Sequence, residues 1–216
     1  RVAAQNMVKE QPDVEYKGVV MTAICQAFDF TVGNTGFSEN YAKRKGYPTV
    51  LTTIQVGPDK PGFMGANYIT IKMVADAKTG KFLGMQAVGE GDVAKRIAIG
   101  AMALHAGMYI EDLVSLDLPY APPYSPAIDN FITAVHVLEN KFLGRMNGIS
   151  ATEVLEKVNK RDEMLLLDVR NMDEYEDTRL GLGEMLIPLP TLRRSLDNLP
   201  HDKEKEIIDS EIIIGR

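Results

Sequence analysis

Residues 68–89 read YITIKMVADAKTGKFLGMQAVG, and this stretch predicts an antiparallel β-hairpin. Its first half alternates apolar and polar side chains through Ile69, Ile71 and Met73, which is the period of a half-buried strand. A turn follows, in which Gly80 can adopt the positive φ that a tight hairpin needs. Residues 82–88 are again mostly apolar, so we expect the second strand to pair with the first.

Strand signals also precede the hairpin. Residues 19–32 alternate loosely between apolar and polar side chains, and residues 49–56 are rich in β-branched residues, so both stretches predict strands. Between them, the glycine- and asparagine-rich residues 33–36 predict a turn. Cys25 is the single cysteine and falls in the first of these strands, where we expect a buried side chain that behaves as a small hydrophobe.

Helical periodicity follows the hairpin. Residues 93–104 are rich in glycine and alanine and apolar on most sides, which is typical of a helix buried in a core or against a partner. Ser125 and Pro126 suit the N-cap and the first position of a later helix. The apolar stripe of that helix comprises Ile128, Phe131, Ile132, Val135 and Leu138. His105 and His136 belong to these two helices, and lone histidines in such positions are expected to be packed, hydrogen-bonded core residues.

A second unit is predicted after a linker at residues 141–148. Residues 150–153 form a capping box before an apolar helix, and residues 164–169 predict a short central strand of a parallel sheet. Residues 190–199 predict a helix, and residues 206–214 predict one or two strands. This order indicates an open α/β sheet. We expect the unit to be incomplete, because roughly 70 residues is small for that class of domain.

The overall composition is that of a folded globular protein. The 216 residues are 45% hydrophobic and 25% charged, and the net charge of −6 argues against a nucleic-acid partner, which would need a basic face. No apolar run reaches the roughly 20 residues of a membrane span. A single cysteine excludes an internal disulfide and fits a reducing cytoplasm. Because the first residue is Arg1 rather than methionine, we expect a processed or excised piece.

Self-contained cofactor and metal sites are not predicted. The G-x-G-x-x-G and G-x-x-x-x-G-K-S/T fingerprints are both absent from the sequence, so this chain alone is not expected to bind a dinucleotide. The three histidines lack zinc-ligand spacing, so no metal is expected. Asp168 and Arg170, followed by Asp173 and Glu174, could form an acid–base group. Charge at the end of a strand is the better interpretation, because no nucleophile accompanies them.

One proline-dense loop has a different character. Residues 120–125 read YAPPYS, so two tyrosines flank two prolines just before a predicted helix. Prolines fix φ and stiffen the loop, and a stiff loop can present phenol groups that donate hydrogen bonds to an anion or a thiolate. The other interpretation is a packing corner of aromatic and proline side chains, and spacing alone does not decide between the two.

The wider sequence around this loop resembles one enzyme family. Residues 118–129, LPYAPPYSPAID, are similar to the YAPPYS motif of the coenzyme A-disulfide reductase and NADH oxidase branch of the pyridine nucleotide-disulfide oxidoreductases. RVAAQN at residues 1–6 resembles the helix that ends the family's FAD domain, and FDFTV at residues 28–32 resembles the first strand of its dimerisation domain. TGKFLGMQAVG at residues 79–89 is similar to the central hairpin. The resemblance covers about residues 1–140.

This resemblance implies roles for particular residues. The intact parent would bind FAD and NAD(P)H and carry a redox cysteine in its N-terminal half, while the tail would form a homodimer. Tyr120 would be a catalytic hydrogen-bond donor to a thiolate or flavin-linked intermediate of the partner subunit, and Tyr124 and Phe63 would help bind the substrate. Many coenzyme A-disulfide reductases carry a Tyr-Tyr-Pro-Gly stretch before the hairpin. That phenol is absent at Gly62 and Phe63, which argues against coenzyme A disulfide as the substrate.

The second unit resembles the start of a rhodanese domain. LLLDVR at residues 165–170, followed by DEY at residues 173–175, is similar to the family's opening strand and the turn after it. IPLP at residues 187–190 and the following Leu192-Arg193 resemble a later segment. The cysteine that carries sulfur in rhodaneses has no counterpart after these residues, so sulfur transfer is not expected from this unit as it stands.

Together these expectations describe an α+β fold, in which a dimerisation domain with an antiparallel sheet flanked by helices precedes a partial α/β rhodanese-like unit. We expect residues 1–17 to form the end of the FAD-domain helix and its connector, residues 18–140 the dimerisation domain, and residues 149–216 the incomplete rhodanese-like domain. The predicted parent is an FAD- and NAD(P)H-dependent oxidoreductase acting on disulfide, persulfide or polysulfide substrates, with this portion inactive alone. The alternative is a freestanding, non-catalytic dimerisation module of the same fold.

Overall fold

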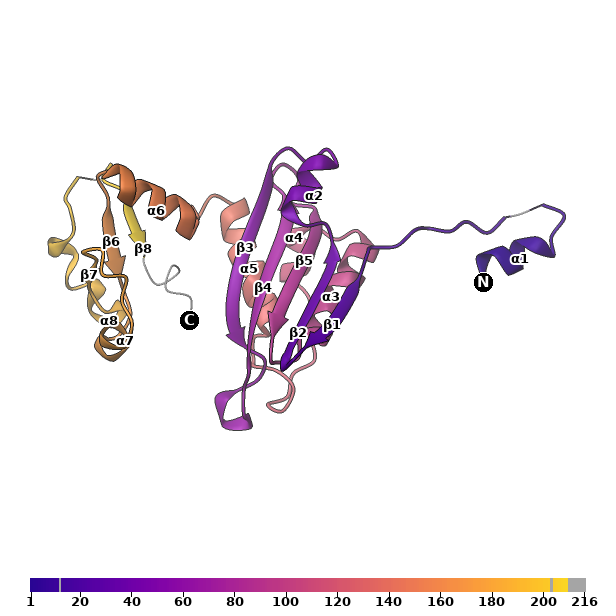
Figure 1. The fold of residues 1–216 in the computed structure, drawn as a ribbon, viewed down its shortest axis with the longest axis horizontal. Helices are drawn as coiled ribbons and strands as arrows, with labels where there is room; N and C mark the ends of the chain where they lie inside the picture. Colours follow the sequence, from indigo (N-terminus) through magenta and orange to yellow (C-terminus); the bar gives the residue numbers. More distant parts are fainter. Residues whose placement is uncertain (12, 203, 210–216) are drawn as a thin grey trace. The chain divides into compact units, whose positions relative to one another are not determined.

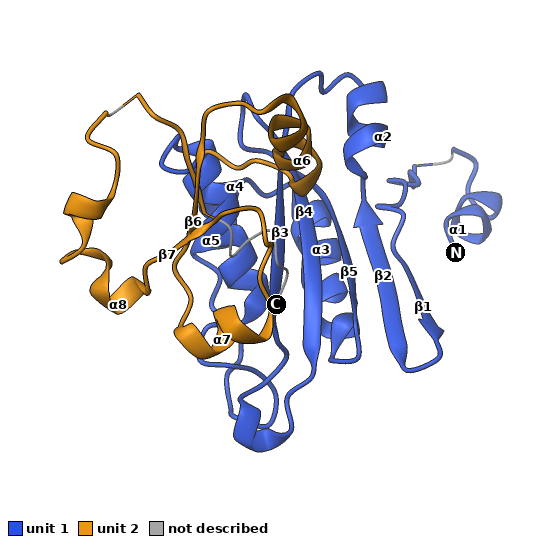
Figure 2. Ribbon diagram, turned by 60° about the vertical axis from the view of Figure 1, so that its left-hand side comes forward, with its two compact units in different colours: residues 1–146 blue, residues 147–216 orange. Residues whose placement is uncertain are grey.

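The computed structural model describes residues 1–11, 13–202 and 204–209, in two compact units that comprise residues 1–146 and 147–216 (Figures 1 and 2). Each unit has its own sheet and its own buried apolar cluster. In the part of the chain that the structure describes, no helix has both the length and the apolar character needed to cross a bilayer.

The first unit is built on a five-stranded antiparallel sheet with the strand order β1-β2-β5-β4-β3. Its strands are β1 (Ala23–Ala27), β2 (Phe30–Gly36), β3 (Val50–Pro58), β4 (Tyr68–Asp76) and β5 (Phe82–Gly89). Its helices are α1 (Val2–Met7), α2 (Glu39–Arg44), η1 (Gly62–Met64), α3 (Val93–Ala106), α4 (Ile110–Val114) and α5 (Asn130–Phe142).

The predicted hairpin of β4 and β5 lies in the middle of this sheet and is confirmed. Ile71 pairs with Ala87 and Met73 pairs with Met85, so the alternating residues of both strands share one face. Gly80 has a φ of +73°, as the turn requires. These side chains are buried, because α3 packs on β2 and β5 while α5 packs on β3 and β4. Figure 1 shows both helices behind the sheet.

Two predictions for residues 19–36 are wrong. Residues 19–32 do not form one strand, since the chain turns at Phe28, whose φ is +56°, and β1 and β2 form a hairpin. Residues 33–36 do not form a turn but complete β2. The glycine at position 33 has a packing reason instead: a Cβ there would lie 2.6 Å from Cγ1 of Ile97, so only glycine lets α3 approach the strand this closely.

The prediction of a buried Cys25 is also wrong. Cys25 is exposed, and so are the other four residues of β1. The physical reason is the position of β1 at the edge of the sheet, where it pairs only with β2. Apolar character alone could not distinguish an edge strand from a central one.

The second unit has a three-stranded parallel sheet with the order β7-β6-β8. Its elements are α6 (Ala151–Lys160), β6 (Leu165–Asp168), α7 (Met172–Asp177), β7 (Met185–Leu186), α8 (Leu189–Leu192), η2 (Leu196–Asn198) and β8 (Ile207–Asp209). The predicted capping box is confirmed at Ser150 and Glu153, and β6 is the predicted central strand.

Two expectations for the second unit need correction. Residues 190–199 do not form one helix but the short α8 and the 3₁₀ turn η2. In α8 the Thr191 hydroxyl donates a 2.8 Å hydrogen bond to the Pro188 carbonyl, a local side-chain bond of the kind that competes with regular helix. Of the strands predicted at residues 206–214, β8 covers 207–209, and residues 210–214 lie outside the described part of the chain.

Candidate functional site

The YAPPYS loop is held as a compact turn by its own backbone. The amides of Tyr124 and Ser125 both donate to the carbonyl of Ala121, at 2.9 and 3.1 Å. The Ser125 hydroxyl donates to the carbonyl of Pro119 at 3.4 Å and closes the base of the loop. The two prolines stiffen the segment between these bonds. The loop therefore has a defined shape without support from its aromatic rings.

The predicted N-cap role of Ser125 is wrong. Helix α5 begins at Asn130, and its N-cap is Asp129, whose carboxylate accepts a hydrogen bond from the Phe131 amide at 2.9 Å. Asp129 is the N-cap instead, because its carboxylate caps a helix as well as a serine hydroxyl does and also pairs with the buried guanidinium of Arg96. Ile128 therefore precedes the helix and is exposed, whereas Phe131, Val135 and Leu138 form the buried stripe as predicted.

Both tyrosines of the loop present their rings to solvent. The exposed fraction is 55% for Tyr120 and 71% for Tyr124, and no hydrogen bond to either phenol oxygen is found among the described residues. These values disfavour the packing-corner interpretation, since a packing corner would bury its aromatic rings. The chain instead holds two exposed tyrosine side chains on a stiff loop at the surface of this unit.

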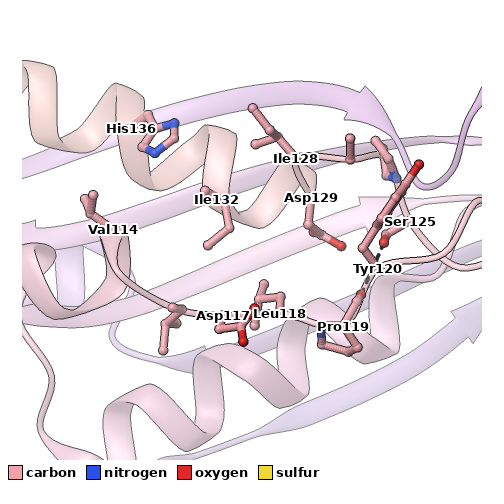
Figure 3. A pocket seen from close by; sticks show the side chains of 13 residues that line it. Val114, Asp117, Leu118, Pro119, Tyr120, Ser125, Ile128, Asp129, Ile132 and His136 are labelled. Carbon is pink, nitrogen blue, oxygen red and sulfur yellow. Dashed lines mark hydrogen bonds between the residues drawn. The ribbon is translucent and has the colours of Figure 1, made fainter.

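Tyr120 borders a cavity of about 280 Å³ between the segment that follows α4 and the start of α5. The residues that line it are Val114, Leu116, Asp117, Leu118, Pro119, Tyr120, Ser125, Pro126, Ala127, Ile128, Asp129, Ile132 and His136. In Figure 3 the imidazole of His136 lies at the opposite end of this cavity from Tyr120. His136 is half-buried, and His105 is exposed, so the packed-core prediction is wrong for His105.

The loop between β3 and β4, which contains η1, projects from the same end of the first unit as the loop between α4 and α5 (Figure 1). Phe63 is the middle residue of η1, and 80% of it is exposed. Phe63 does not line the cavity beside Tyr120. The structure therefore places Tyr120 and Tyr124 together and Phe63 apart from them, at the same end of the sheet.

Sequence reasoning missed the buried centre that lies beneath both loops. Arg96 of α3 is 0% exposed, and its guanidinium forms a two-point contact with Asp129, from Nε to Oδ1 at 3.1 Å and from Nη2 to Oδ2 at 2.8 Å. Nη2 also donates to the Asp59 carbonyl at 2.8 Å, and Nη1 donates to the Asp92 carbonyl at 3.0 Å. An arginine in an otherwise apolar helix was the available signal, because a charge there needs a partner.

A shallow apolar groove runs along the outer side of α3. It encloses about 440 Å³ and is lined by Lys95, Ala98, Ile99, Met102, Ala103, Ala106, Met108, Leu116 and Leu118. Met102 is 68% exposed. The predicted helix that is apolar on most sides thus buries one face on the sheet and leaves a second apolar face open.

The charged cluster of the second unit is a structural ion pair. Asp168 is fully buried, and its carboxylate accepts hydrogen bonds from the amide, Nε and Nη2 of Arg170, the last at 2.7 Å. Arg170 also donates to the carbonyls of Glu174 and Thr178. These bonds join the end of β6 to α7, which supports the strand-end interpretation. Among the described residues, no group of three metal-ligating side chains is present.

Comparison with known proteins identifies the class. Residues 22–132 match the model of the pyridine nucleotide-disulphide oxidoreductase dimerisation domain. The chain therefore belongs to this family, and the resemblance of its first unit to that domain is confirmed.

Particular relatives narrow the comparison. The chain is 34% identical over 138 residues to the NAD(P)H sulfur oxidoreductase (CoA-dependent) of Pyrococcus furiosus. This alignment covers 64% of this chain and 30% of that protein. It is similar in structure to the NAD-dependent persulfide reductase from A. fulgidus, with a TM-score of 0.79 and 38% identity, and to the reduced CoADR-RHD of Bacillus anthracis, with a TM-score of 0.82 and 31% identity. Both comparisons cover 92% of this chain and 35% of the other. The chain thus spans about a third of the length of these relatives.

Proposed function

We propose that this chain is the C-terminal portion of an FAD- and NAD(P)H-dependent oxidoreductase that acts on persulfide, polysulfide or disulfide substrates. One observation carries the proposal: the exposed phenol of Tyr120 stands on a stiff loop over a cavity, and Cys25, the one thiol among the described residues, does not line that cavity. Relatives named for sulfur and persulfide reduction support the substrate class.

In this proposal Tyr120 donates a hydrogen bond to a thiolate that belongs to the active site of the partner subunit. A phenol is a good donor to an anion because it keeps its proton at neutral pH. The bond would hold the sulfur in place and favour its charged form. Tyr124 and Phe63, which are exposed at the same end of the unit, would contact the substrate.

The apolar groove on α3 is the surface that we assign to the homodimer. An exposed apolar face on a monomer's helix marks a partner site, and the match to a dimerisation domain supports a second copy as the partner. Leu116 and Leu118 line both this groove and the cavity beside Tyr120, so the two hollows are neighbours. Dimer contact and active-site closure would therefore be neighbouring functions of one surface.

FAD and NAD(P)H are assigned to the intact parent. This sequence has no dinucleotide fingerprint, and the exposed tyrosines suit the edge of a site better than a cofactor cradle. The flavin would supply the two-electron reduction of sulfur when bound. This chain's own part would be limited to positioning, hydrogen bonding and exclusion of water.

The substrate is more consistent with a persulfide or polysulfide than with coenzyme A disulfide. At residues 62–63 the chain carries glycine and phenylalanine, so the phenol that the family resemblance implies for coenzyme A-disulfide reduction is missing. The exposed ring of Phe63 offers apolar contact only. Tyr120 would then be the single phenol donor at the sulfur.

The second unit is proposed to be an incomplete rhodanese-like domain. Its support is the LLLDVR strand, the parallel sheet and the likeness to CoADR-RHD, which covers more of this chain than the first unit alone. Residues 147–216 contain no cysteine, so our proposal gives these residues themselves no role in carrying sulfur. A freestanding dimerisation module is the rival function for the whole chain.

The test uses the full-length flavoprotein with NAD(P)H and a persulfide or polysulfide substrate. We expect Tyr120→Phe to lower kcat roughly 10- to 100-fold, the value of one hydrogen bond to a charged group, with the flavin content unchanged. Tyr16→Phe is the matched control, because Tyr16 is also exposed but lies in the connector before β1. An unchanged kcat in Tyr120→Phe would contradict the catalytic role.

A further inference from the structure

Two loops with separate origins in the sequence share one buried anchor. We propose that Arg96 and its neighbour Lys95 position the active-site edge: Arg96 acts on Tyr120 and Phe63 through the two loops that carry them, and Lys95 acts on the Tyr120 loop alone. The inference rests on the proposed function, because it gives these loops a common task. It goes beyond that function in naming the buried group that sets their relative positions.

The loop that carries Phe63 is closed and anchored by Asp59. The amide of Asp59 donates to the Asn67 carbonyl, and the amide of Asn67 donates back to Oδ1 of Asp59, both at 2.9 Å. Oδ2 of Asp59 accepts the Asp92 amide at 3.2 Å, just before α3. The Asp59 carbonyl accepts Nη2 of Arg96 at 2.8 Å. Both ends of this loop are therefore tied to the first turn of α3.

The loop that carries Tyr120 is tied to the same turn of α3 by charge. Asp129, four residues after the end of the loop at Ser125, is paired with Arg96 and also with Lys95, whose Nζ lies 3.2 Å from Oδ2. Lys95 Nζ donates in addition to the Tyr124 carbonyl at 2.8 Å. Two consecutive residues of α3 thus hold the loop. Arg96 holds it through Asp129, and Lys95 holds it through Asp129 and the Tyr124 carbonyl.

One nitrogen atom joins the two anchors. Nη2 of Arg96 donates both to the Asp59 carbonyl and to the Asp129 carboxylate, each at 2.8 Å. The planar guanidinium fixes the angle between these bonds, whereas a lysine ammonium would act as a single rotating point charge. A shift of one loop would therefore be opposed by the other. This is the geometry of a positioning residue rather than of a simple helix-to-helix ion pair.

A purely structural ion pair is the competing explanation, and the two make different kinetic predictions. If the ion pair is only structural, breaking it would lower the melting temperature and would change kcat only by reducing the amount of folded enzyme. A positioning residue would change the rate per folded active site. Misplacing a catalytic group by about 1 Å can cost as much as roughly 100-fold in rate.

Lys95→Met is the first test variant, because it removes one of the two tethers of the Tyr120 loop while leaving Arg96 and its contacts with Asp59 intact. Because Lys95 also lines the groove assigned to the homodimer, the rate is compared at equal dimer content, measured by size-exclusion chromatography. In the full-length holoenzyme we expect kcat per bound flavin to fall about tenfold with KM nearly unchanged. Lys43→Met is the matched control, since Lys43 also pairs with a carboxylate, at 2.9 Å to Glu39, but on α2 at the other face of the sheet.

Asp59→Asn and Arg96→Lys complete the series. Asp59→Asn loosens the Phe63 loop alone and should raise KM more than it lowers kcat. Arg96→Lys should affect both constants. If Arg96→Lys fails to fold, the two single-loop variants still decide the proposal. Losses in the melting temperature with unchanged kcat and KM per flavin would overturn it.

A double variant separates this inference from the function on which it rests. If Lys95 acts through Tyr120, Lys95→Met combined with Tyr120→Phe should have the kcat of Tyr120→Phe alone. If the two substitutions lower kcat by factors that multiply in the double variant, Lys95 acts independently of Tyr120, and the positioning role is overturned. If Tyr120→Phe by itself leaves kcat unchanged, the proposed function fails. If Tyr120→Phe lowers kcat but Lys95→Met does not, only the inference fails.

Discussion

Asp76 shows at the scale of one residue how a turn is fixed by a carboxylate. The Thr79 hydroxyl donates to Oδ2 at 2.5 Å, and the amides of Lys78 and Thr79 donate at 3.3 and 3.2 Å. The Thr79 hydrogen bond is the main reason that the pKa of Asp76 lies below its ordinary value; burial opposes the shift, and the two amides add to it. The charged form therefore stabilises the hairpin turn.

This gives a prediction for the pH dependence of stability. Because the folded-state pKa is lowered, the contribution of Asp76 is complete above the unfolded-state pKa of roughly 3.9 and is lost as the pH falls through the folded-state value. We expect Asp76→Asn to reduce the free energy of unfolding by about 1 kcal/mol near pH 7, and by less as the pH approaches 3. Urea denaturation of both proteins at several pH values measures this difference in the free energy of unfolding. A difference that grows as the pH falls would contradict the stabilising role of the charged Asp76.

At this scale the sequence revealed the loop itself but not the contacts that hold it in place. The proline-flanked tyrosines were visible as a motif, because the prolines and the phenols are local features. Arg96 was missed, since its four bonding partners come from segments up to 37 residues away. Ser125 was mistaken for a cap for the same reason: the advantage of Asp129 comes from Arg96 and Lys95.

At the scale of elements, glycines decide how closely β5 meets its neighbours. A Cβ at Gly84 would lie 2.4 Å from both the nitrogen and the oxygen of the Phe37 backbone, and 2.9 Å from the Thr35 carbonyl oxygen. Backbone atoms cannot move aside as a flexible side chain can. The crossing from β2 to α2 therefore depends on the missing side chain of this strand residue.

We accordingly expect Gly84→Ala to lower the free energy of unfolding by about 2 kcal/mol through overpacking. Gly62→Ala is the matched control, since a Cβ at Gly62 meets no atom within 4 Å and its φ is not positive. Thermal and urea denaturation of both variants would show the difference. Equal stabilities would mean that β5 shifts to accept the methyl group.

The elements with strong local periodicity were predicted well, and those decided by tertiary position were not. The β4–β5 hairpin, α3 and the α6 capping box agree with the sequence because periodicity and capping are encoded locally. The strand at residues 33–36 was taken for a turn, because its glycines serve packing against α3 rather than backbone reversal. The exposure of β1 depends on its edge position, which no window of sequence contains.

At the scale of the whole molecule, the proposed function gives this chain the edge of an active site whose redox centre belongs to another part of the parent protein. The chain spans about a third of its relatives' length. Tyr120 and Tyr124 are exposed, and an apolar groove lies on the neighbouring helix α3. A surface that joins a dimer contact to an exposed phenol is explained if the thiol it serves belongs to the other subunit. The account therefore depends on Tyr120 acting between subunits.

Subunit mixing measures this directly. One full-length subunit carries Tyr120→Phe, and the other carries an intact Tyr120 but lacks the redox cysteine of its N-terminal half. Each homodimer should have little activity. If Tyr120 acts across the interface, the mixed dimer contains one complete site, and we predict about half of the wild-type kcat per dimer with the persulfide substrate, on the physical argument that sites built from two subunits complement. A mixed dimer as inactive as its parents would contradict the account.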